Sequence, residues 1–456
     1  MMRSNGFVSL LAATVIGVYV LVVVGATAAL ADAATACGGW PLCQGSLSNP
    51  DVLVVLFHRA AATVVGLLVV AAAVVGWRRV TRRVQIALVM SLSLYPFQAG
   101  LGALVATGAA LEQIHLFVGM VIFGTLVLAL AWHLEAETGT DDAPETPPDL
   151  SGPVDEPVEP PASVHTLSGM SRLKATVGAY FQLMKPRLMW LLCLVAGAGM
   201  VLAGTPTVRT VIATLGGGVL AIGASGTFNH VLERDIDKRM ERTSDRPLAT
   251  HEVPVRNALA FGGLLTVASL WAFLTVNLLT AALGLAAIAF YSVVYTLILK
   301  PNTVQNTVIG GAAGALPALI GYAAVTGTVG LGGLVLAGVI FLWTPAHFYN
   351  LALAYRDDYE RGGFPMMPIV RGETETRKHI VLYLAATLLG AGVLAAVANL
   401  GWLYGLTTVA LGAVFLWMVV RLHYEQSEGA AFRAFHASNA YLGLVLVAIV
   451  VDALAI

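Results

Sequence analysis

Residues 223–247 read Gly-Ala-Ser-Gly-Thr-Phe-Asn-His-Val-Leu-Glu-Arg-Asp-Ile-Asp-Lys-Arg-Met-Glu-Arg-Thr-Ser-Asp-Arg-Pro. A long apolar run ends here and passes into a dense mixture of acidic and basic side chains. Asn229, Glu233 and Asp237 are spaced four residues apart, so a helix would place them on one face, drifting by about 40° per step, with Asp235 off that face. Oxygen-bearing side chains on one stripe suit Mg²⁺, which shares its remaining ligand positions with water and phosphate oxygens. A solvated loop with ordinary salt bridges explains the same residues, and both interpretations stay open at this point.

The composition around this stretch indicates an integral membrane protein. Of the 456 residues, 58% are hydrophobic and only 11% are charged, and the mean hydropathy is +0.81. The net charge of -1 gives no indication of nucleic-acid binding. Because lipid cannot satisfy open backbone groups, spanning segments are expected to be helical. The sequence therefore predicts an all-α, polytopic protein of the lipid bilayer.

Thirteen apolar stretches are long enough to cross about 30 Å of hydrocarbon. Four come early, near residues 8–30, 52–76, 85–107 and 114–133. Nine follow after a gap, near residues 187–204, 210–228, 257–277, 281–299, 305–325, 331–353, 380–398, 402–420 and 437–455. The first stretch exceeds a normal signal-peptide core, so we expect an uncleaved anchor, although the Ala-rich residues 28–36 leave cleavage open.

The distribution of Lys and Arg predicts the orientation. With the N-terminus in the cytoplasm, only Arg59 and Arg209 lie toward the outside. The opposite orientation would reverse that asymmetry, against the tendency of basic residues to stay inside. We therefore expect a multi-pass protein of the cell membrane whose segment 229–247 faces the cytoplasm.

A segment between the two groups of stretches differs from the rest of the chain. Residues 134–165 are rich in Asp, Glu and Pro and poor in apolar residues, a composition typical of extended, disordered linkers. The sequence therefore predicts a four-helix module at 1–133, a linker at 134–170 and a nine-helix module at 171–456.

Two histidines lie inside apolar stretches of the first module. His58 and His115 are expected at similar depth in the outer half of the membrane, where ionisable groups are costly and usually functional. Two imidazoles facing each other in a four-helix bundle could ligate a heme iron from both sides. Alternatively, each could hydrogen-bond a neighbouring helix. Cys37 and Cys43, in the external loop, could form a disulfide on the oxidising face or remain thiols.

The first module resembles one half of heme A synthase, a family built of two four-helix bundles. The residues that carry the resemblance are Cys37–Gly45, His58-Arg59 and Gln98–Val105. The resemblance implies that His58 and His115 are heme ligands and that Cys37 and Cys43 are a redox pair. Val55 stands where that family usually has a glutamate, so we expect a heme-holding or vestigial module rather than an active oxidase.

A second acidic cluster occurs four stretches after the first, in residues 355–368, which read Tyr-Arg-Asp-Asp-Tyr-Glu-Arg-Gly-Gly-Phe-Pro-Met-Met-Pro. Stretches four apart run in the same direction, so both acidic clusters are expected at the cytoplasmic surface. Two such clusters facing each other could hold a Mg²⁺-diphosphate, with Arg and Lys neutralising the departing pyrophosphate. Apolar helices around them would house a lipid tail and exclude water.

This layout resembles the UbiA-type intramembrane prenyltransferases, and within them the enzymes with a heme acceptor. The matching residues cover about 175–456: Asn229–Asp237, Arg242-Thr243, Arg246-Pro247, Lys300-Pro301, Gln305-Asn306, Gly310–Gly314, Trp343–Phe348 and the 355–368 cluster. Glu233 stands where the family usually has aspartate. The resemblance implies a nine-helix UbiA-type bundle with Mg²⁺ as cofactor.

The same resemblance implies roles for individual residues. The expected holders of Mg²⁺-diphosphate are Asn229, Glu233, Asp237, Asp357 and Asp358, and all of these except Asp357 are expected metal ligands. The expected phosphate contacts are Arg234, Lys238, Arg239, Arg242, Lys300 and Arg356.

The implied reaction transfers a farnesyl group from farnesyl diphosphate to a vinyl group of heme B. The product is heme O, for the biogenesis of heme-copper oxidases, and heme A synthase or oxidase assembly factors are expected partners. Two alternatives remain: a UbiA-type enzyme with a quinone or lipid acceptor, and a non-enzymatic membrane heme carrier. The carrier would explain His58 and His115 but not the two acidic clusters.

Overall fold

The structure is a computed structural model that describes residues 5–30, 37, 39–41, 43, 45–144 and 169–455. Within these ranges every regular element is helical. The elements are α1 (Asn5–Leu30), α2 (Pro50–Gly76), α3 (Arg82–Ala106), α4 (Glu112–Thr138), α5 (Gly169–Leu183), α6 (Pro186–Ala203), α7 (Val208–Leu232), α8 (Arg234–Asp237), α9 (Val255–Leu274), α10 (Leu278–Ala289), the π-helical η3 (Phe290–Leu299), α11 (Lys300–Asn302), α12 (Asn306–Thr326), α13 (Leu331–Ala354), α14 (Arg356–Arg361), α15 (Met367–Val370), α16 (Glu373–Ala398), α17 (Trp402–Glu425) and α18 (Glu428–Ala455).

Among the described residues, thirteen helices are long and apolar enough to cross a membrane. This confirms the predicted all-α, multi-pass architecture. One span, Leu278–Asn302, joins α10, η3 and α11. Large apolar side chains point outward along the spans: Val208 is 76% exposed and Trp271 is 71% exposed. Lipid is the solvent that suits such a surface.

The predicted linker lies mostly outside the described residues, which leave out 145–168. At its edges, α4 continues to Thr138 and α5 begins at Gly169, so helix extends further into the predicted linker than composition suggests. The linker itself stays a prediction.

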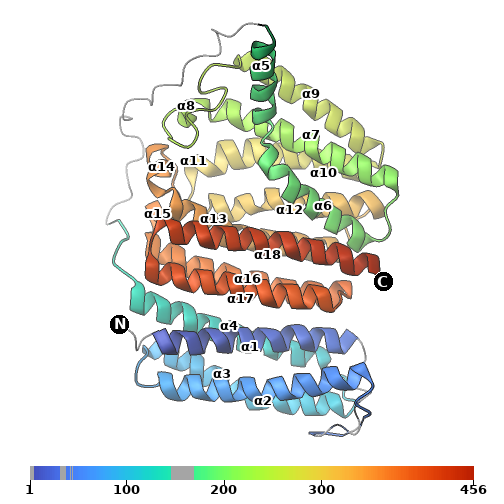
Figure 1. Cartoon of the computed structure of the whole chain (residues 1–456), viewed down its shortest axis with the longest axis vertical. Helices are drawn as coiled ribbons and strands as arrows, with labels where there is room; N and C mark the ends of the chain where they lie inside the picture. Colours follow the sequence, from blue (N-terminus) through green and yellow to red (C-terminus); the bar gives the residue numbers. More distant parts are fainter. Residues whose placement is uncertain are drawn as a thin grey trace. The chain divides into compact units, whose positions relative to one another are not determined.

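The contacts divide the chain into two compact units, residues 1–141 with 377–448, and residues 142–376 with 449–456. This grouping differs from the boundaries at 133 and 170 that were predicted from composition, which remain a proposal. In the first unit, α1 packs against α2, α4 and α17, and Figure 1 shows α1 to α4 side by side. Tyr19 of α1 is fully buried, and its ring centroid lies 5.7 Å from that of Phe123 in α4.

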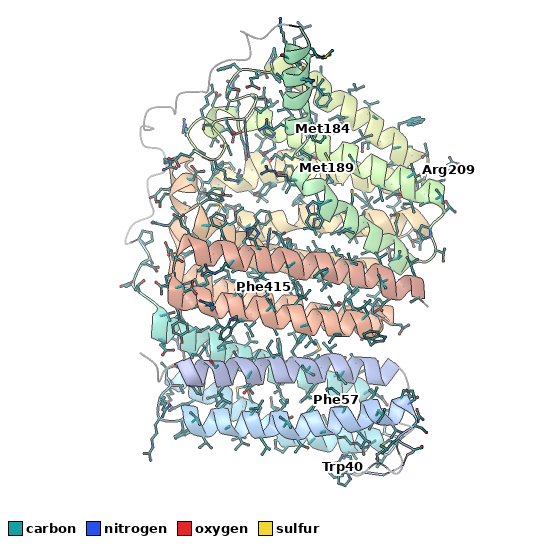
Figure 2. All side chains as sticks on the ribbon, viewed as in Figure 1. Trp40, Phe57, Met184, Met189, Arg209 and Phe415 are labelled. Atoms are coloured by element: carbon teal, nitrogen blue, oxygen red, sulfur yellow. A yellow bond between two sulfur atoms is a disulfide. The ribbon has the colours of Figure 1, made fainter. Side chains whose placement is uncertain are left out.

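In the second unit, α7 packs on α9, and α12 packs on α6 and α13. The backbones of α6 and α12 approach closely at two glycines: a Cβ on Gly199 would collide with the Ala318 carbonyl, and one on Gly321 with the Ala196 carbonyl. Small residues permit this approach in membrane helices. The short segments α8, α11, α14 and α15 gather at one end of the unit (Figure 1), and Arg209 lies at the opposite end of α7 (Figure 2).

Candidate active site

The first acidic stretch places its three polar residues together in a buried position. Asn229, Glu233 and Asp237 are 2%, 4% and 2% exposed, whereas the side chain of Asp235 is 65% exposed. The helix is not continuous as expected, because α7 ends at Leu232 and α8 begins at Arg234. The hydrogen bonds across the break still join residues four apart, from Glu233 N to Asn229 O (2.9 Å) and from Asp237 N to Glu233 O (2.7 Å). The spacing therefore keeps the three side chains on one side.

Three cations surround these residues. Lys300 Nζ lies 2.5 Å from Glu233 Oε1. One guanidinium nitrogen of Arg246 lies 2.7 and 2.8 Å from the two oxygens of Asp237 and 3.8 Å from Glu233 Oε2. Lys185 donates a hydrogen bond to Asn229 Oδ1. Two carboxylates thus face three basic groups, so the cluster as a whole favours an additional anion.

Burial and neighbouring charges shift the pKa values of this cluster in different directions. Burial lowers the pKa of Lys185 to about 7, with Arg246 adding to the effect and Glu233 opposing it. Burial also acts to raise the pKa of Glu233, but Lys300 and Lys185 hold that pKa below its usual value. For Asp237, burial outweighs Arg246 and the pKa lies above its usual value. A bound anion next to Lys185 would favour its charged form.

The π-helical segment η3 completes the cluster from another helix. Thr296 donates to the Tyr291 carbonyl (2.8 Å) and accepts from Asn229 Nδ2 (3.1 Å). Lys185 Nζ lies 3.3 Å from the Tyr291 hydroxyl. Wider π turns are rare and occur frequently at functional sites. Here the wider turn directs Tyr291 and Thr296 to the same buried polar group.

The second acidic cluster separates its two aspartates. Asp358 is 5% exposed and accepts hydrogen bonds from Glu241 N (2.7 Å), Arg242 N (3.4 Å) and Arg361 (2.9 Å). It therefore ties α14 to the loop that follows α8. The side chain of Asp357 is 78% exposed and lies 3.6 Å from Arg356. The structure brings Asp358, but not Asp357, into the buried region near the first cluster.

Of the basic residues expected to contact phosphate, Lys300 is the one that contacts Glu233. Arg234 and Lys238 pair with exposed Asp235. Arg242 lies over the rings of Tyr355 and Tyr359, at 4.9 and 5.4 Å from their centroids. Arg239 is half-buried, and the side chain of Arg356 is 40% exposed. Their phosphate contacts stay predictions.

Sequence reasoning missed two basic residues of the cluster, Lys185 and Arg246. Each directly precedes a proline, and Lys185 adopts a left-handed conformation with φ 55° at the start of α6. A non-glycine residue in that conformation is uncommon. The Lys-Pro and Arg-Pro pairs were the available signal. Lys185 lies 44 positions from Asn229, whereas Arg246 lies only 9 positions from Asp237.

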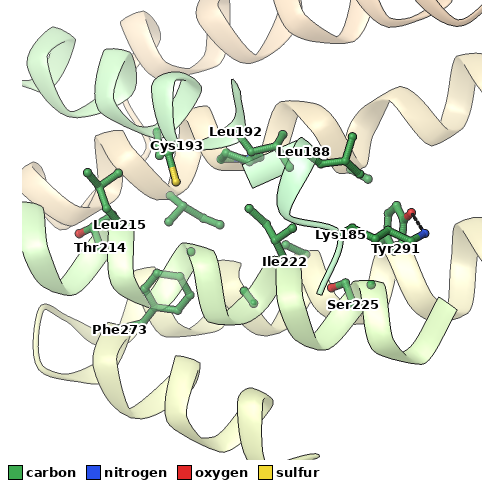
Figure 3. A pocket seen from close by; sticks show the side chains of 18 residues that line it. Lys185, Leu188, Leu192, Cys193, Thr214, Leu215, Ile222, Ser225, Phe273 and Tyr291 are labelled. Atoms are coloured by element: carbon green, nitrogen blue, oxygen red, sulfur yellow. Dashed lines mark hydrogen bonds between the residues drawn. The ribbon is translucent and has the colours of Figure 1, made fainter. Parts of the chain in front are cut away.

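An apolar cavity adjoins the cluster. About 740 Å³ of space lies between the atoms here, including space that is open to the surroundings, and α6, α7, α9, α10, η3 and α12 contribute to its wall. Figure 3 shows Lys185 and Tyr291 at one end and Thr214, Leu215 and Phe273 toward the other. Polar groups at one end and an apolar interior suit an amphiphilic molecule with an anionic head.

The oxygen-bearing side chains of the cluster fit a hard cation that also binds oxygens of a ligand. Among the described residues, no three His, Cys, Asp or Glu side chains gather closely enough to hold a metal by themselves. Glu233 and Asp237 nevertheless lie within reach of the same Arg246 nitrogen. Mg²⁺ is usually bound through one or two carboxylates together with substrate phosphates and water. These two carboxylates, with the Asn229 amide, match that pattern.

The first unit holds a separate pair of histidines. The rings of His58 (α2) and His115 (α4) have centroids 6.5 Å apart, and Nδ1 of each is buried without a hydrogen-bond partner. Gly25 and Gly102 adjoin the two rings, where a Cβ would lie 3.4 and 3.1 Å from Cε1 of His58 and His115. His115 Nε2 lies 3.4 Å from Gln98 Nε2. Each of the two imidazoles thus keeps one buried nitrogen without a partner, which suits residues that would hold a metal.

The cysteines of the first unit are bonded to each other. Cys37 and Cys43 form a disulfide whose Cα atoms lie 5.1 Å apart. Cys193, in α6, is a free thiol that lines the apolar cavity.

Comparisons with known proteins come from sequence and from fold. Residues 190–443 match the model of the UbiA prenyltransferase family. The chain is 78% identical to protoheme IX farnesyltransferase 1 of Natronomonas pharaonis and 67% identical to protoheme IX farnesyltransferase of Haloarcula marismortui, with all of each chain covered. A Saccharopolyspora erythraea protoheme IX farnesyltransferase 1 is 46% identical over 61% of this chain and 91% of its own length, so shorter relatives exist.

Two solved structures share the fold. The apo structure of a UbiA homologue from Aeropyrum pernix aligns with a TM-score of 0.52 at 20% identity, over 58% of this chain and 98% of its own. A digeranylgeranylglyceryl phosphate synthase aligns with a TM-score of 0.52 at 15% identity, over 62% of this chain and 100% of its own.

Proposed function

The chain belongs to the UbiA prenyltransferase family, and we propose that it transfers a farnesyl group from farnesyl diphosphate to a vinyl group of heme B, giving heme O. The observation that carries the proposal is the buried group of two carboxylates and three cations at one end of an apolar cavity. Relatives of up to 78% identity that are named protoheme IX farnesyltransferase support heme as the acceptor.

The cluster binds and orients the diphosphate. Lys185, Lys300 and Arg246 supply positive charge inside a site with little water, where fixed charges stabilise developing negative charge most strongly. Asn229, Glu233 and Asp237 would hold Mg²⁺, which when bound stabilises the pyrophosphate leaving group as a Lewis acid. Tyr291 is positioned to donate a hydrogen bond to a phosphate oxygen in place of its contact with Lys185.

The reaction breaks the bond between C1 of the farnesyl group and the diphosphate oxygen, and pyrophosphate leaves with the electron pair. The terminal carbon of the heme vinyl group forms the new bond to C1. Water then adds at the neighbouring vinyl carbon and loses a proton, which gives the hydroxyethylfarnesyl side chain. The apolar wall contributed by Leu188, Leu192 and Ile222 keeps water from the allylic cation before it is trapped.

We place the active-site end of the second unit at the cytoplasmic surface of the cell membrane, together with the N-terminus. Arg209 lies at the opposite end of α7 from Glu233 (Figure 2), and the excess of Lys and Arg at the Glu233 end supports this orientation. The heme O formed would pass to heme A synthase or to oxidase assembly factors.

The decisive experiment compares two aspartates two residues apart. Membranes that contain the chain are incubated with Mg²⁺, heme B and farnesyl diphosphate, and heme O is measured by mass spectrometry. The wild-type chain forms heme O. In Asp237→Ala the rate of heme O formation should fall at least about 100-fold. In Asp235→Ala, which changes an exposed residue, the rate should stay near that of wild type. Absence of heme O from the wild-type reaction would refute the proposal. Farnesylation of an added quinone precursor or glycerol lipid in its place would establish the alternative acceptor.

We also propose that the first unit binds heme through His58 and His115. The two unpartnered Nδ1 atoms and the 6.5 Å centroid separation support this assignment. A bis-histidine site would give a low-spin absorption spectrum that is lost in His58→Ala and in His115→Ala. His133→Ala is the matched control, because His133 lies on α4 against Phe7. An unchanged spectrum in both ligand variants would overturn the assignment.

A further inference from the structure

Phe273 closes one part of the apolar cavity. It is fully buried, lies at the C-terminal end of α9, and is part of the cavity wall. Its ring is held between two helices at glycines: a Cβ on Gly217 of α7 would lie 2.8 Å from Phe273 Cδ1, and one on Gly284 of α10 would collide with the other edge of the ring. The ring therefore has little freedom to turn aside.

The distance from the polar end to this ring is fixed by α7. Gly226 adjoins Lys185, since a Cβ there would lie 3.2 Å from Lys185 Cγ, and Gly217 adjoins Phe273. The two glycines are nine positions apart, which corresponds to about 14 Å of helix. The residues of α7 on this side of the cavity recur at helical spacing, at 214, 215, 218, 221, 222, 225 and 226, so the cavity runs along the helix (Figure 3).

This length matches one class of prenyl chain. Three backbone bonds of an extended polypeptide advance by about 3.3–3.6 Å, or about 1.2 Å per bond. At that rate the twelve-carbon main chain of a farnesyl group extends about 14 Å, a geranyl group about 9 Å and a geranylgeranyl group about 19 Å. With the diphosphate at Lys185, a farnesyl tail reaches the turn of α7 on which Phe273 packs. One further isoprene unit would have to pass the Phe273 ring toward Thr214 and Leu215.

We propose that Phe273 is the specificity-determining floor of the prenyl site and that it limits the donor to three isoprene units. The inference rests on the proposed farnesyl transfer and adds which residue limits the length of the donor. Phe273 lies far from the diphosphate end and takes no part in bond making or breaking.

The test measures donor preference with geranyl, farnesyl and geranylgeranyl diphosphate, each with Mg²⁺ and heme B. Wild type uses farnesyl diphosphate best. Phe273→Ala and the milder Phe273→Leu should raise the ratio of kcat/KM for the geranylgeranyl over the farnesyl donor by about 10–200-fold, the range for filling or opening an apolar pocket. Phe261→Ala is the matched control, because Phe261 lies on the same helix but packs on Tyr180. It should leave the ratio unchanged.

A second variant tests the same floor from the opposite direction. Ala221 lines the cavity about 7 Å along α7 from Gly226, so Ala221→Leu should move the preference toward the geranyl donor. Protection from thermal unfolding by geranylgeranyl diphosphate, measured without heme, gives an independent readout: it should increase in the Phe273 variants alone.

The outcomes separate the two proposals. If wild type prenylates heme with none of the three donors, the proposed function fails. If wild type uses farnesyl diphosphate but Phe273→Leu and Ala221→Leu keep the wild-type ratios, the assigned floor is wrong while the function stands. Because these two variants are smaller changes than Phe273→Ala, they decide the question even if the alanine variant does not fold.

Discussion

Arg246 is the residue on which both buried carboxylates converge. It lies 2.7 Å from Asp237 and 3.8 Å from Glu233, with only 17% of its side chain exposed. Arg246→Ala would leave a buried carboxylate unpaired, which typically costs about 3–5 kcal/mol, and would remove one positive charge from the diphosphate site. We expect heme O formation to fall at least about 100-fold, measured as kcat/KM for farnesyl diphosphate.

Arg421→Ala is the control for this prediction. Arg421 of α17 has a side chain that is 52% exposed and pairs with Glu425, and exposed pairs contribute less than about 1 kcal/mol. Activity should therefore stay near wild type. Equal losses in the two variants would contradict the assignment of Arg246 to the site.

Asp358 and Asp357 are adjacent in sequence but differ in role. Asp358 accepts hydrogen bonds from two backbone N–H groups of the loop after α8. Asp358→Asn should therefore lower the free energy of unfolding by about 1–3 kcal/mol and misplace Arg242 of that loop. Asp357→Asn, at an exposed position, should be close to neutral. The measurements are the thermal midpoint and heme O formation for each variant.

A Mg²⁺ titration distinguishes a loop tether from a lost metal ligand. If Asp358 acts mainly through the loop, added Mg²⁺ does not restore the activity of Asp358→Asn, and the thermal midpoint falls with or without Mg²⁺. Recovery at high Mg²⁺ with an unchanged midpoint would instead support the metal role that the family resemblance implies.

At this scale the sequence predicted the acidic residues better than the basic ones. The spacing of Asn229, Glu233 and Asp237 was enough to place them together, because their contacts follow from one helical stripe. Lys185 reaches Asn229 across 44 positions, and Lys300 reaches Glu233 across 67. Spacing within one segment carries no information about such partners, so these two lysines could be placed at the site only from the resemblance or from the structure.

At the scale of helices, close packing of α6 on α12 depends on glycine. A Cβ on Gly321 would collide with the Ala196 carbonyl, and a backbone carbonyl cannot rotate away as a side chain can. Gly321→Ala should therefore push the two helices apart and cost at least about 1–3 kcal/mol of unfolding free energy. Since α6 also carries part of the cavity wall, the affinity for farnesyl diphosphate should fall as well.

Gly216→Ala should raise the free energy of unfolding, in contrast to Gly321→Ala. Gly216 lies within α7, and no atom lies within 4 Å of the position that a Cβ would take there, so the change gains up to about 1 kcal/mol of helix propensity. Thermal unfolding in detergent measures both variants. Destabilisation by both would mean that helix packing is not what distinguishes the two glycines.

The helices themselves were largely predictable, and their interruptions were not. A run of apolar residues long enough to cross lipid has few alternatives to a helix, which explains why all thirteen spans were found. The break at Glu233 lies where Lys300 and Arg246 contact that residue, and the π-helical segment η3 lies where Thr296 contacts Asn229. Hydropathy averages over such local changes and cannot detect them.

At the scale of the whole chain, the groups proposed for prenyl transfer all come from residues 185–358, in one compact unit. The first four helices belong to the other unit, where α1 and α4 pack on α17. Composition predicts a boundary at the acidic linker because it changes from one stretch of the sequence to the next. The contacts between α1 and α17 instead join segments almost 400 residues apart, which composition does not reveal. Shorter relatives, such as the one that aligns with 61% of this chain, indicate that prenyl transfer does not require the full length.

A fragment that begins at Gly169 should therefore keep farnesyl transfer within a few-fold of the full chain while losing any heme spectrum that depends on His58 and His115. Its thermal midpoint should fall only slightly, because lipid tails can cover the apolar face of α17 about as well as α1 does. The lost polar contacts include Lys378 with Glu135 (2.8 Å) and Tyr424 with Glu137 (2.6 Å). They also include Gln426 with the Thr138 carbonyl (2.8 Å) and the backbone N–H groups of Glu373 and Thr374 with Asp142 (3.0 and 3.1 Å). Exposed contacts of this kind are each worth about 1 kcal/mol or less. Co-expression of residues 1–144 as a separate chain should restore the midpoint, since those contacts need no covalent linker. A folded fragment without transferase activity would show that the first four helices take part in the transfer, and would remove the separation of roles between the two units.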